Sequence, residues 1–439
     1  MPGGVTDSCR RCPKTVAKPL DHRSQQLSQA FGCVRLAPLN PTHPHDLQMK
    51  TDWSTLLREL VAFDTTSRHS NLALIDYVQH YLTEFGIDSE LVFDSTGSKA
   101  NLFASIGPDH AGGVMLSGHT DVVPVDGQDW DSDPFSVTEK DALYFGRGTA
   151  DMKGFIACVL SVVPHMTSLK LQSPIHIALS YDEEIGCLGV RRLIETLSGA
   201  PVLPRMAVIG EPTSMQVVCA HKGKRAFRVS VDGRSAHSAY PTDGVNAIDY
   251  AVDLISRIHQ LQADIRVHGP FDQSYRVPNT TLHVGTIRGG SALNIVPENC
   301  VFEFEIRHLP EQDIDELVDA ISNYASETLV PAMQTVDPGT GIVIESLTRY
   351  PGLATDRDES VVGFVQSLLS GEKSTEKISF GSEAGLFKDG LGIPGVVCGP
   401  GSIQQAHRPN EYVSTEQLNT CAGMIQRLVD RLAEDRLPV

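Results

Sequence analysis

The sequence lacks an apolar run long enough to cross a membrane, which takes roughly 20 consecutive apolar residues. The longest candidate, at 155–166, is interrupted by Ser161 and Pro164, so we interpret it as a buried helix. We therefore expect no membrane partner.

The chain has 439 residues, of which 41% are hydrophobic and 21% charged, as in ordinary globular proteins. This length predicts two or three domains, because single hydrophobic cores stop growing at about 250–300 residues.

Basic residues are the scarcer charged class. The chain has 36 Lys and Arg against 54 Asp and Glu, a formal net charge of −18. Such a surface repels phosphate backbones, so we expect no nucleic-acid partner. Most of the excess carboxylates are expected to contribute solubility, while some could instead bind metal.

Cysteines are few, scattered and odd in number, with nine in the chain. This pattern argues against a disulfide framework and predicts a reducing, cytoplasmic location. The pair Cys9 and Cys12 lacks a second C-x-x-C or a clustered histidine, so we do not expect a zinc knuckle. No apolar core typical of a signal peptide occurs within residues 1–40.

Residues 1–48 lack the periodicity of the rest of the chain. They contain six prolines and six basic residues, which predicts a disordered or non-native N-terminal extension. A transit peptide is an alternative, since the stretch is basic. A helical pattern begins after Met49, with Asp52 as the expected N-cap.

From Met49 onward, predicted helices and strands alternate. The helices are expected at 53–64, 72–86, 152–166, 188–197, 358–370 and 415–433. The strands are expected at 101–106, 113–118, 175–181, 206–210, 377–380 and 395–398. Short apolar runs between amphipathic helices predict an α/β sheet covered by helices on both faces.

The pattern changes between residues 225 and 337. Half-buried strands are predicted at 226–231, 281–287 and 300–306, and helices at 244–262 and 311–328. This β-α-β-β-α order is typical of a ferredoxin-like unit. We therefore expect the catalytic domain to comprise 49–224 and 338–439, with 225–337 inserted between its two parts.

Acidic residues and histidines gather where predicted strands end, which is where open α/β sheets bind their ligands. His119 and Asp121 follow the apolar run 114–116. A neutral imidazole suits zinc, and a nearby carboxylate can fix its tautomer. Asp151 follows a glycine-rich segment. Taken alone, His119 would more often be a hydrogen-bonded structural histidine, and Asp151 the N-cap of the next helix.

Three consecutive carboxylates, Asp182, Glu183 and Glu184, follow the predicted strand at 175–181. Their repulsion can be relieved by solvent or by bound cations. Glu211 ends another strand, and His407 follows the segment 399–402. Each cluster is weak evidence alone, but five at strand ends in one chain indicate a functional site.

This ordered set resembles the di-zinc family of aminoacylases, carboxypeptidase G and succinyl-diaminopimelate desuccinylase. The resemblance extends from Met49 to the C-terminus and implies a zinc-peptidase-like mixed sheet with an inserted dimerisation domain. It implies two divalent metal ions per chain, zinc or cobalt. Five residues would be ligands: Asp151 bridging both ions, His119 and Glu211 at one site, and Glu184 and His407 at the other.

The same resemblance implies the remaining catalytic roles. Asp121 would orient His119. Glu183 would be the general base, taking a proton from the attacking water and delivering it to the leaving amine. His237, in the inserted domain of a homodimer, would reach the partner subunit's active site and donate to the oxyanion.

Four residues are expected to bind substrate: Asn294, Arg307, Ser382 and Glu383. An arginine suits a carboxylate because of its two-pronged geometry. Arg307 could equally form a surface ion pair, and Asn294 could be a turn residue. Ser382 stands where the family pattern would have threonine, but it keeps the hydroxyl.

The segments 380–387 and 399–412 resemble the acetylornithine deacetylase branch of that family. The expected reaction is therefore hydrolysis of N-acetyl-L-ornithine to L-ornithine and acetate, as in arginine biosynthesis. Acidic residues such as Glu383 or Glu411 could favour the ornithine ammonium.

The alternatives within this enzyme class are a desuccinylase and a broader N-acyl-amino-acid hydrolase. An alternative of another class is a catalytically silent metal-binding or assembly protein, which would be marked by loss of the base or a ligand. A nucleotide-binding protein fits poorly, because no P-loop or G-x-G-x-x-G follows a strand.

Overall fold

The computed structural model describes residues 51–109, 112–370, 374–434 and 437. The predicted N-terminal extension, 1–48, lies outside these residues. Within the described part of the chain, every helix is too short or too polar to span a membrane.

The largest sheet in the described residues is a mixed sheet of nine strands. Its strand order is β1-β2-β6-β3-β7-β15-β8-β13, with β14 also pairing with β8. The strands β6 (Ile175–Ser180), β3 (Val114–His119), β7 (Met206–Pro212) and β15 (Gly395–Gly399) are mutually parallel and lie side by side. The flanking strands are β1 (Ser89–Phe93), β2 (Ala100–Ile106), β8 (Val217–His221), β13 (Leu353–Ala354) and β14 (Thr375–Ile378).

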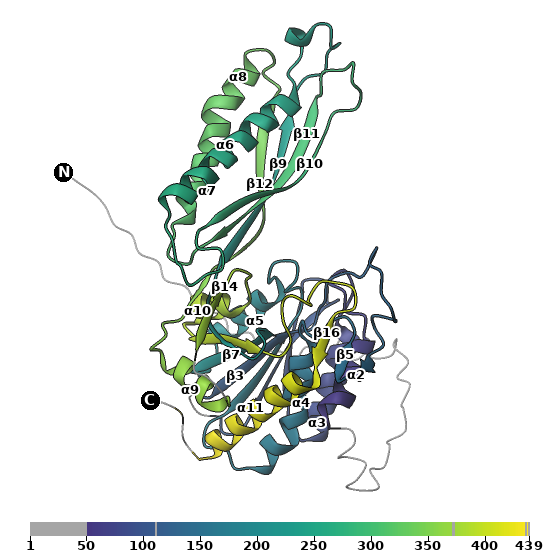
Figure 1. The fold of residues 1–439 in the computed structure, drawn as a ribbon, viewed down its shortest axis with the longest axis vertical. Helices are drawn as coiled ribbons and strands as arrows, with labels where there is room; N and C mark the ends of the chain where they lie inside the picture. Colours follow the sequence, from purple (N-terminus) through teal and green to yellow (C-terminus); the bar gives the residue numbers. More distant parts are fainter. Residues whose placement is uncertain (1–50, 110–111, 371–373, 435–436, 438–439) are drawn as a thin grey trace, which may run out of the picture. The chain divides into compact units, whose positions relative to one another are not determined.

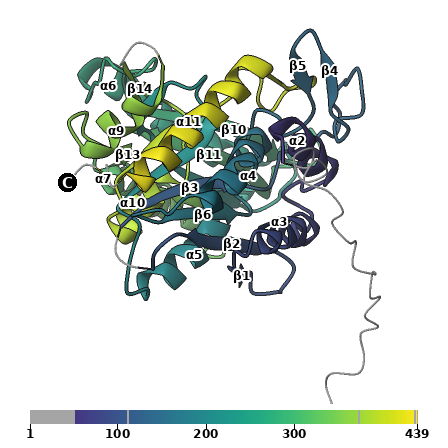
Figure 2. The same cartoon turned by 90° about the horizontal axis from the view of Figure 1, so that it is seen from below.

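Helices cover both faces of this sheet, which confirms the predicted fold class. Successive residues of β3 point to opposite sides: Val114 and Leu116 join one hydrophobic core, and Met115 joins the other. The first core is covered by α2 (Trp53–Ala62), α3 (Leu72–Glu84), α4 (Lys153–Ser168), α9 (Ser360–Leu368) and α11 (Thr415–Ala433). The second is covered by α5 (Gly189–Ser198) and α10 (Ala384–Leu391). Figure 2 shows α4 and α11 side by side over the sheet.

The helix N-terminus predicted at Asp52 is present. The Asp52 carboxylate accepts hydrogen bonds from the backbone amides of Ser54 and Thr55, which otherwise lack partners in the first turn of α2.

A second, four-stranded sheet has the ferredoxin-like topology that the sequence predicted. The elements are β9 (Gly223–Asp232), η1 (Pro241–Asp243), α6 (Ala247–His268), β10 (Thr281–Gly289), β11 (Asn299–His308), α7 (Ile314–Asn323), η2 (Tyr324–Leu329), α8 (Val330–Gln334) and β12 (Gly341–Tyr350). The strand order is β10-β11-β9-β12, and all neighbours are antiparallel. The helices α6 and α7 cover one face of this sheet (Figure 1), so its other face carries partly exposed side chains.

The strand β12 lies beyond residue 337, where the sequence analysis ended the inserted segment. All of its residues are exposed or only partly buried, and a register shift interrupts its pairing between Ser346 and Thr348. A strand with little buried apolar surface and a bulge gives a weak period-2 signal, so the sequence did not show it.

A small third sheet joins β16 (Tyr412–Ser414), β5 (Leu143–Phe145) and β4 (Thr138–Lys140). It brings the segment before β16, which contains His407, next to the segment after β5, which leads to Asp151.

Candidate metal centre

The four parallel strands of the larger sheet end at one edge. His119 is the last residue of β3, Glu211 lies near the end of β7, and Glu183 and Glu184 follow β6. The strand β15 continues into the segment that carries His407. This is the edge at which α/β sheets place their ligand sites.

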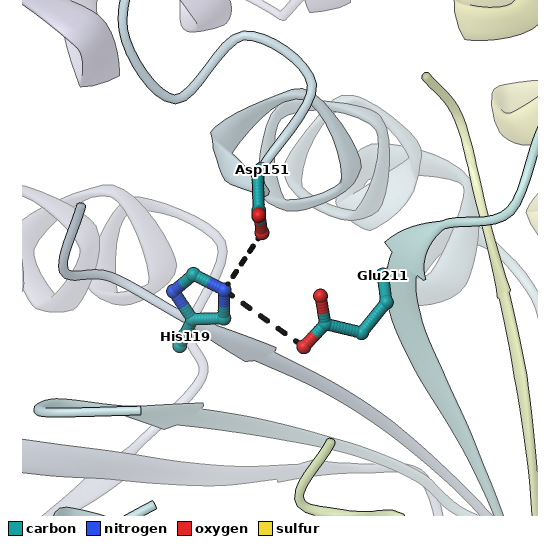
Figure 3. Close-up of side chains that lie close together, drawn as sticks. All are labelled: His119, Asp151 and Glu211. Atoms are coloured by element: carbon teal, nitrogen blue, oxygen red, sulfur yellow. Dashed lines mark hydrogen bonds and ion pairs between the residues drawn. The ribbon is translucent and has the colours of Figure 1, made fainter. Parts of the chain in front are cut away.

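Three buried side chains form a first group at this edge (Figure 3). The Nε2 of His119 lies 3.0 Å from an Asp151 carboxylate oxygen and 3.8 Å from a Glu211 carboxylate oxygen. All three residues are at most 4% exposed. The Nδ1 of His119 lies 2.9 Å from the backbone carbonyl oxygen of Asp121, which fixes the ring and leaves Nε2 facing the two carboxylates.

A second group shares Asp151 with the first. The Nε2 of His407 lies 3.3 Å from the other Asp151 oxygen and 3.0 Å from a Glu184 oxygen. In each group, one candidate ligand atom per residue lies within 4.8 Å of the others. Asp151 therefore offers one oxygen to each group, as a bridging ligand would.

The electrostatics of these groups fit bound cations. The buried Oε1 atoms of Glu184 and Glu211 have no hydrogen-bond partner. Burial, followed by repulsion from Asp151, raises the pKa of both carboxyls. Hydrogen bonds to Asp151 and Glu184 raise the pKa of His407 to about 10, so the cluster favours positive charge. Two imidazoles with three carboxylates also form the mixed nitrogen and oxygen ligand set that suits zinc or cobalt.

Asp121 contacts residues of both groups. One of its carboxylate oxygens accepts the Glu183 amide at 3.1 Å, and the other accepts the Glu184 amide at 3.3 Å. The Ser67 hydroxyl donates to the second oxygen at 2.7 Å. Its carboxylate is 3.6 Å from the Nδ1 of His119, farther than its own backbone carbonyl. Asp121 thus holds the backbone of both glutamates as well as the histidine.

Glu183 lines the same pocket as Glu184 and His407. Burial raises its pKa to about 8, with His119 acting in the opposite direction and Glu184 adding to the rise. The Cys187 thiol donates to its Oε1 at 3.3 Å. Cys187 has a φ of 53°, a conformation that is uncommon outside glycine and that is often found at functional sites.

The predicted substrate residues are dispersed. Arg307 lines the pocket, whereas Ser382 and Glu383 are buried at the start of α10 and are not part of the lining. His237 and Asn294 lie together on the four-stranded unit, where the Ser238 amide donates to the Asn294 carbonyl at 3.1 Å. Both are exposed, and in the described residues neither lines the pocket of the metal centre.

The sequence analysis missed a buried ion pair that joins the two ligand-bearing segments. An Arg147 Nη1 donates to Glu411 at 2.6 Å, and both side chains are 1% exposed. The other Glu411 oxygen accepts the amides of Ala150 and Asp151 at 2.9 and 3.1 Å. Glu411 is therefore fully engaged and is not available to an ornithine ammonium. Arg147 follows Gly146 in the glycine-rich segment, but no local pattern pairs it with a residue 264 positions away.

Arg147 also connects to the His407 segment through Gln128. Its Nη2 donates to the Gln128 side-chain oxygen at 2.7 Å, and the Gln128 amide donates to the His407 carbonyl at 3.1 Å. Lys224 and Tyr350, two further residues of the pocket lining, were also missed.

Comparison with known proteins gives consistent matches over most of the chain. Residues 115–431 match the family model described as Peptidase family M20/M25/M40. Acetylornithine deacetylase of Shigella sonnei (strain Ss046) is 36% identical over 361 residues, covering 82% of this chain and 91% of that protein.

Solved structures show the same fold at lower identity. A tripeptidase from Staphylococcus aureus subsp. aureus Mu50 superposes with a TM-score of 0.67 at 21% identity, covering 88% of this chain and 99% of its own. A dinuclear metal binding peptidase of the M20 family from Bacillus subtilis has a TM-score of 0.56 at 14% identity, covering 89% and 99%.

Proposed function

The chain belongs to peptidase family M20/M25/M40 and is a metal-dependent amidohydrolase, and we propose that it removes the acetyl group of N-acetyl-L-ornithine. The products would be L-ornithine and acetate, a step of arginine biosynthesis. The observation that carries this proposal is the pair of groups sharing Asp151, with Glu183 beside them in one pocket. The deacetylase relative supports the substrate.

The five clustered side chains would hold two divalent ions, zinc or cobalt. Asp151 would contribute to both sites, with His119 and Glu211 completing one and Glu184 and His407 completing the other. Ions so held would polarise the scissile carbonyl and make a water molecule acidic near neutral pH.

Glu183 is the proposed general base. It accepts the proton of the attacking water and returns it to the nitrogen of the leaving amine, as a positioned carboxylate can. Two contacts of Glu183 support this role: the Asp121 carboxylate fixes its backbone, and the Cys187 thiol orients its side chain. Its neighbour Glu184 faces His407 in the same pocket. The presence of the base and of all five ligand residues favours an active enzyme over a silent member of the fold.

Arg307 is proposed to bind the substrate carboxylate, since it lines the same pocket as Asp151, Glu184, Glu211 and His407. His237 is proposed to act on the neighbouring site of a homodimer, donating to the oxyanion. Its exposure and its absence from the pocket lining of its own chain support that arrangement. Asn294, held beside His237, would enter the neighbouring site with it. The cytoplasmic location expected from the cysteines stays a prediction.

A turnover comparison tests the substrate. One metal-loaded preparation is assayed for amine release from N-acetyl-L-ornithine and from N-succinyl-diaminopimelate. We expect kcat/KM to be higher for the acetyl substrate by at least about tenfold, equivalent to roughly 1.4 kcal/mol in the transition state. A higher kcat/KM for the succinyl substrate would reject the deacetylase assignment, while the assignment as an amidohydrolase would stand.

A further inference from the structure

Three charged side chains meet at the end of the four-stranded sheet that borders the metal centre. Lys224 in β9 and Arg307 in β11 are partners in register across the two strands. Glu305 lies two residues before Arg307, on the same face of β11. The Lys224 Nζ is 3.0 Å from one Glu305 oxygen, and the Arg307 Nε is 2.8 Å from the other. Glu305 thus uses one oxygen for each cation.

Only the two cations of this trio line the pocket. Lys224 and Arg307 share that lining with Glu183, Glu184 and His407, whereas Glu305 is not part of it. The substrate therefore meets two positive groups whose combined charge is reduced from +2 to +1 by Glu305. The three side chains are 24–32% exposed, so water screens this charge only in part.

Lys224 and Arg307 form one wall of the pocket, hereafter the cationic wall. We propose that Glu305 makes the cationic wall selective for substrates that present a single carboxylate to these two side chains. Such substrates are N-acyl amino acids with uncharged or cationic side chains. The inference rests on the proposed function and specifies its substrate class. One substrate carboxylate pairs with the single net positive charge. A second carboxylate would have to compete with Glu305 for Lys224 or Arg307, at close range to a like charge. Removing the Glu305 charge would free one cation for it.

The cationic wall offers no acidic group to a substrate ammonium, since Glu305 is its only nearby acid in the trio and both Glu305 oxygens are paired with Lys224 and Arg307. Discrimination against dicarboxylates is therefore predicted to come from repulsion of the second acid, rather than from attraction of a particular side chain. N-acetyl-L-glutamine and N-acetyl-L-glutamate test this directly, because they differ by little more than the side-chain charge.

The experiment compares kcat/KM for these two substrates in metal-loaded protein and in three variants. The wild type should prefer the glutamine substrate by at least tenfold. In Glu305→Gln this ratio should fall at least tenfold, and in Lys224→Met it should rise. Glu303→Gln is the matched control, because Glu303 lies on the same face of β11 and pairs with Arg228 outside the pocket lining. Its ratio should equal that of the wild type.

An unchanged ratio in Glu305→Gln would overturn the inference, as would an equal change in the Glu303→Gln control. If Glu305→Gln does not fold, the ratio in Lys224→Met decides, and a fall or no change there overturns the inference. If the folded, metal-loaded wild type hydrolyses neither substrate nor N-acetyl-L-ornithine, the proposed function fails. The inference is then decided by calorimetric binding of the same pair of compounds, in which Glu305→Gln should raise the affinity for the glutamate compound relative to the glutamine compound, and an unchanged ratio overturns it.

Discussion

Replacing Glu411 with Gln should destabilise the metal-free protein, because the change keeps the shape of a buried side chain and removes its charge. Arg147 and Glu411 are each 1% exposed and 2.6 Å apart. Removing one partner of a buried ion pair leaves the other charge uncompensated and costs about 3–5 kcal/mol. Arg147 would keep the Gln128 side-chain oxygen at 2.7 Å and the Arg408 carbonyl at 3.4 Å as acceptors, so we expect the lower end, about 3 kcal/mol.

The same substitution should weaken metal binding. The Glu411 carboxylate accepts the amides of Ala150 and Asp151, and these charge-assisted bonds set the position of Asp151. A neutral amide oxygen holds them less strongly, by about 1 kcal/mol for each bond. Since Asp151 serves both groups, we expect both ions to be lost at lower chelator concentration than in the wild type.

Urea unfolding of metal-free protein, followed by the combined fluorescence of Trp53 and Trp130, measures the loss of stability. The Arg147 guanidinium lies over the Trp130 ring at 5.2 Å from its centroid, so this tryptophan reports on the pair itself. Glu90→Gln is the matched control, because Glu90 is exposed on β1. In a double-mutant cycle with Arg147→Met, the two losses should be strongly non-additive. Additive losses, or a Glu411→Gln loss within about 0.5 kcal/mol of the control, would refute the reasoning.

Three further predictions concern the proposed catalytic groups. Glu183→Gln should retain metal yet lose roughly 10²–10⁴-fold in turnover, the range for general acid–base catalysis, and a small loss with metal retained would mean another base. Burial raises the pKa of Glu183 to about 8, and a base acts when deprotonated. The acid limb of kcat/KM should therefore lie at or below pH 8, since bound cations favour the carboxylate, and a limb above pH 8 would contradict this. Mixing His237→Ala with Glu183→Gln protein should restore partial activity through one intact site per heterodimer, whereas no recovery despite subunit exchange would place His237 outside the partner's site.

Local chemistry made much of this structure predictable. The helices at 53–62 and 415–433 carry clear apolar faces, and residues such as His119 and Glu211 stand at strand ends. In a sheet with parallel central strands these ends converge at one edge, so the sequence placed the candidate ligands correctly relative to the strands.

What could not be predicted depends on contacts between distant segments. The Arg147–Glu411 pair joins residues 264 positions apart, and a buried ion pair leaves no periodic signature. The burial of Glu383 follows from the packing of α10 against the sheet rather than from its own sequence neighbourhood. Lys224 and Glu305 read as ordinary surface charges until the pairing of β9 with β11 brings them together beside the pocket.

The central claim is that two ions are bound by the two groups that share Asp151. Anomalous diffraction from crystals of zinc-loaded protein, recorded on both sides of the zinc edge, tests it most directly. We predict two peaks, one among His119, Asp151 and Glu211 and one among Asp151, Glu184 and His407, each about 2.0–2.2 Å from its ligand atoms. A single peak, or peaks at other residues, in protein that hydrolyses its substrate would contradict the account.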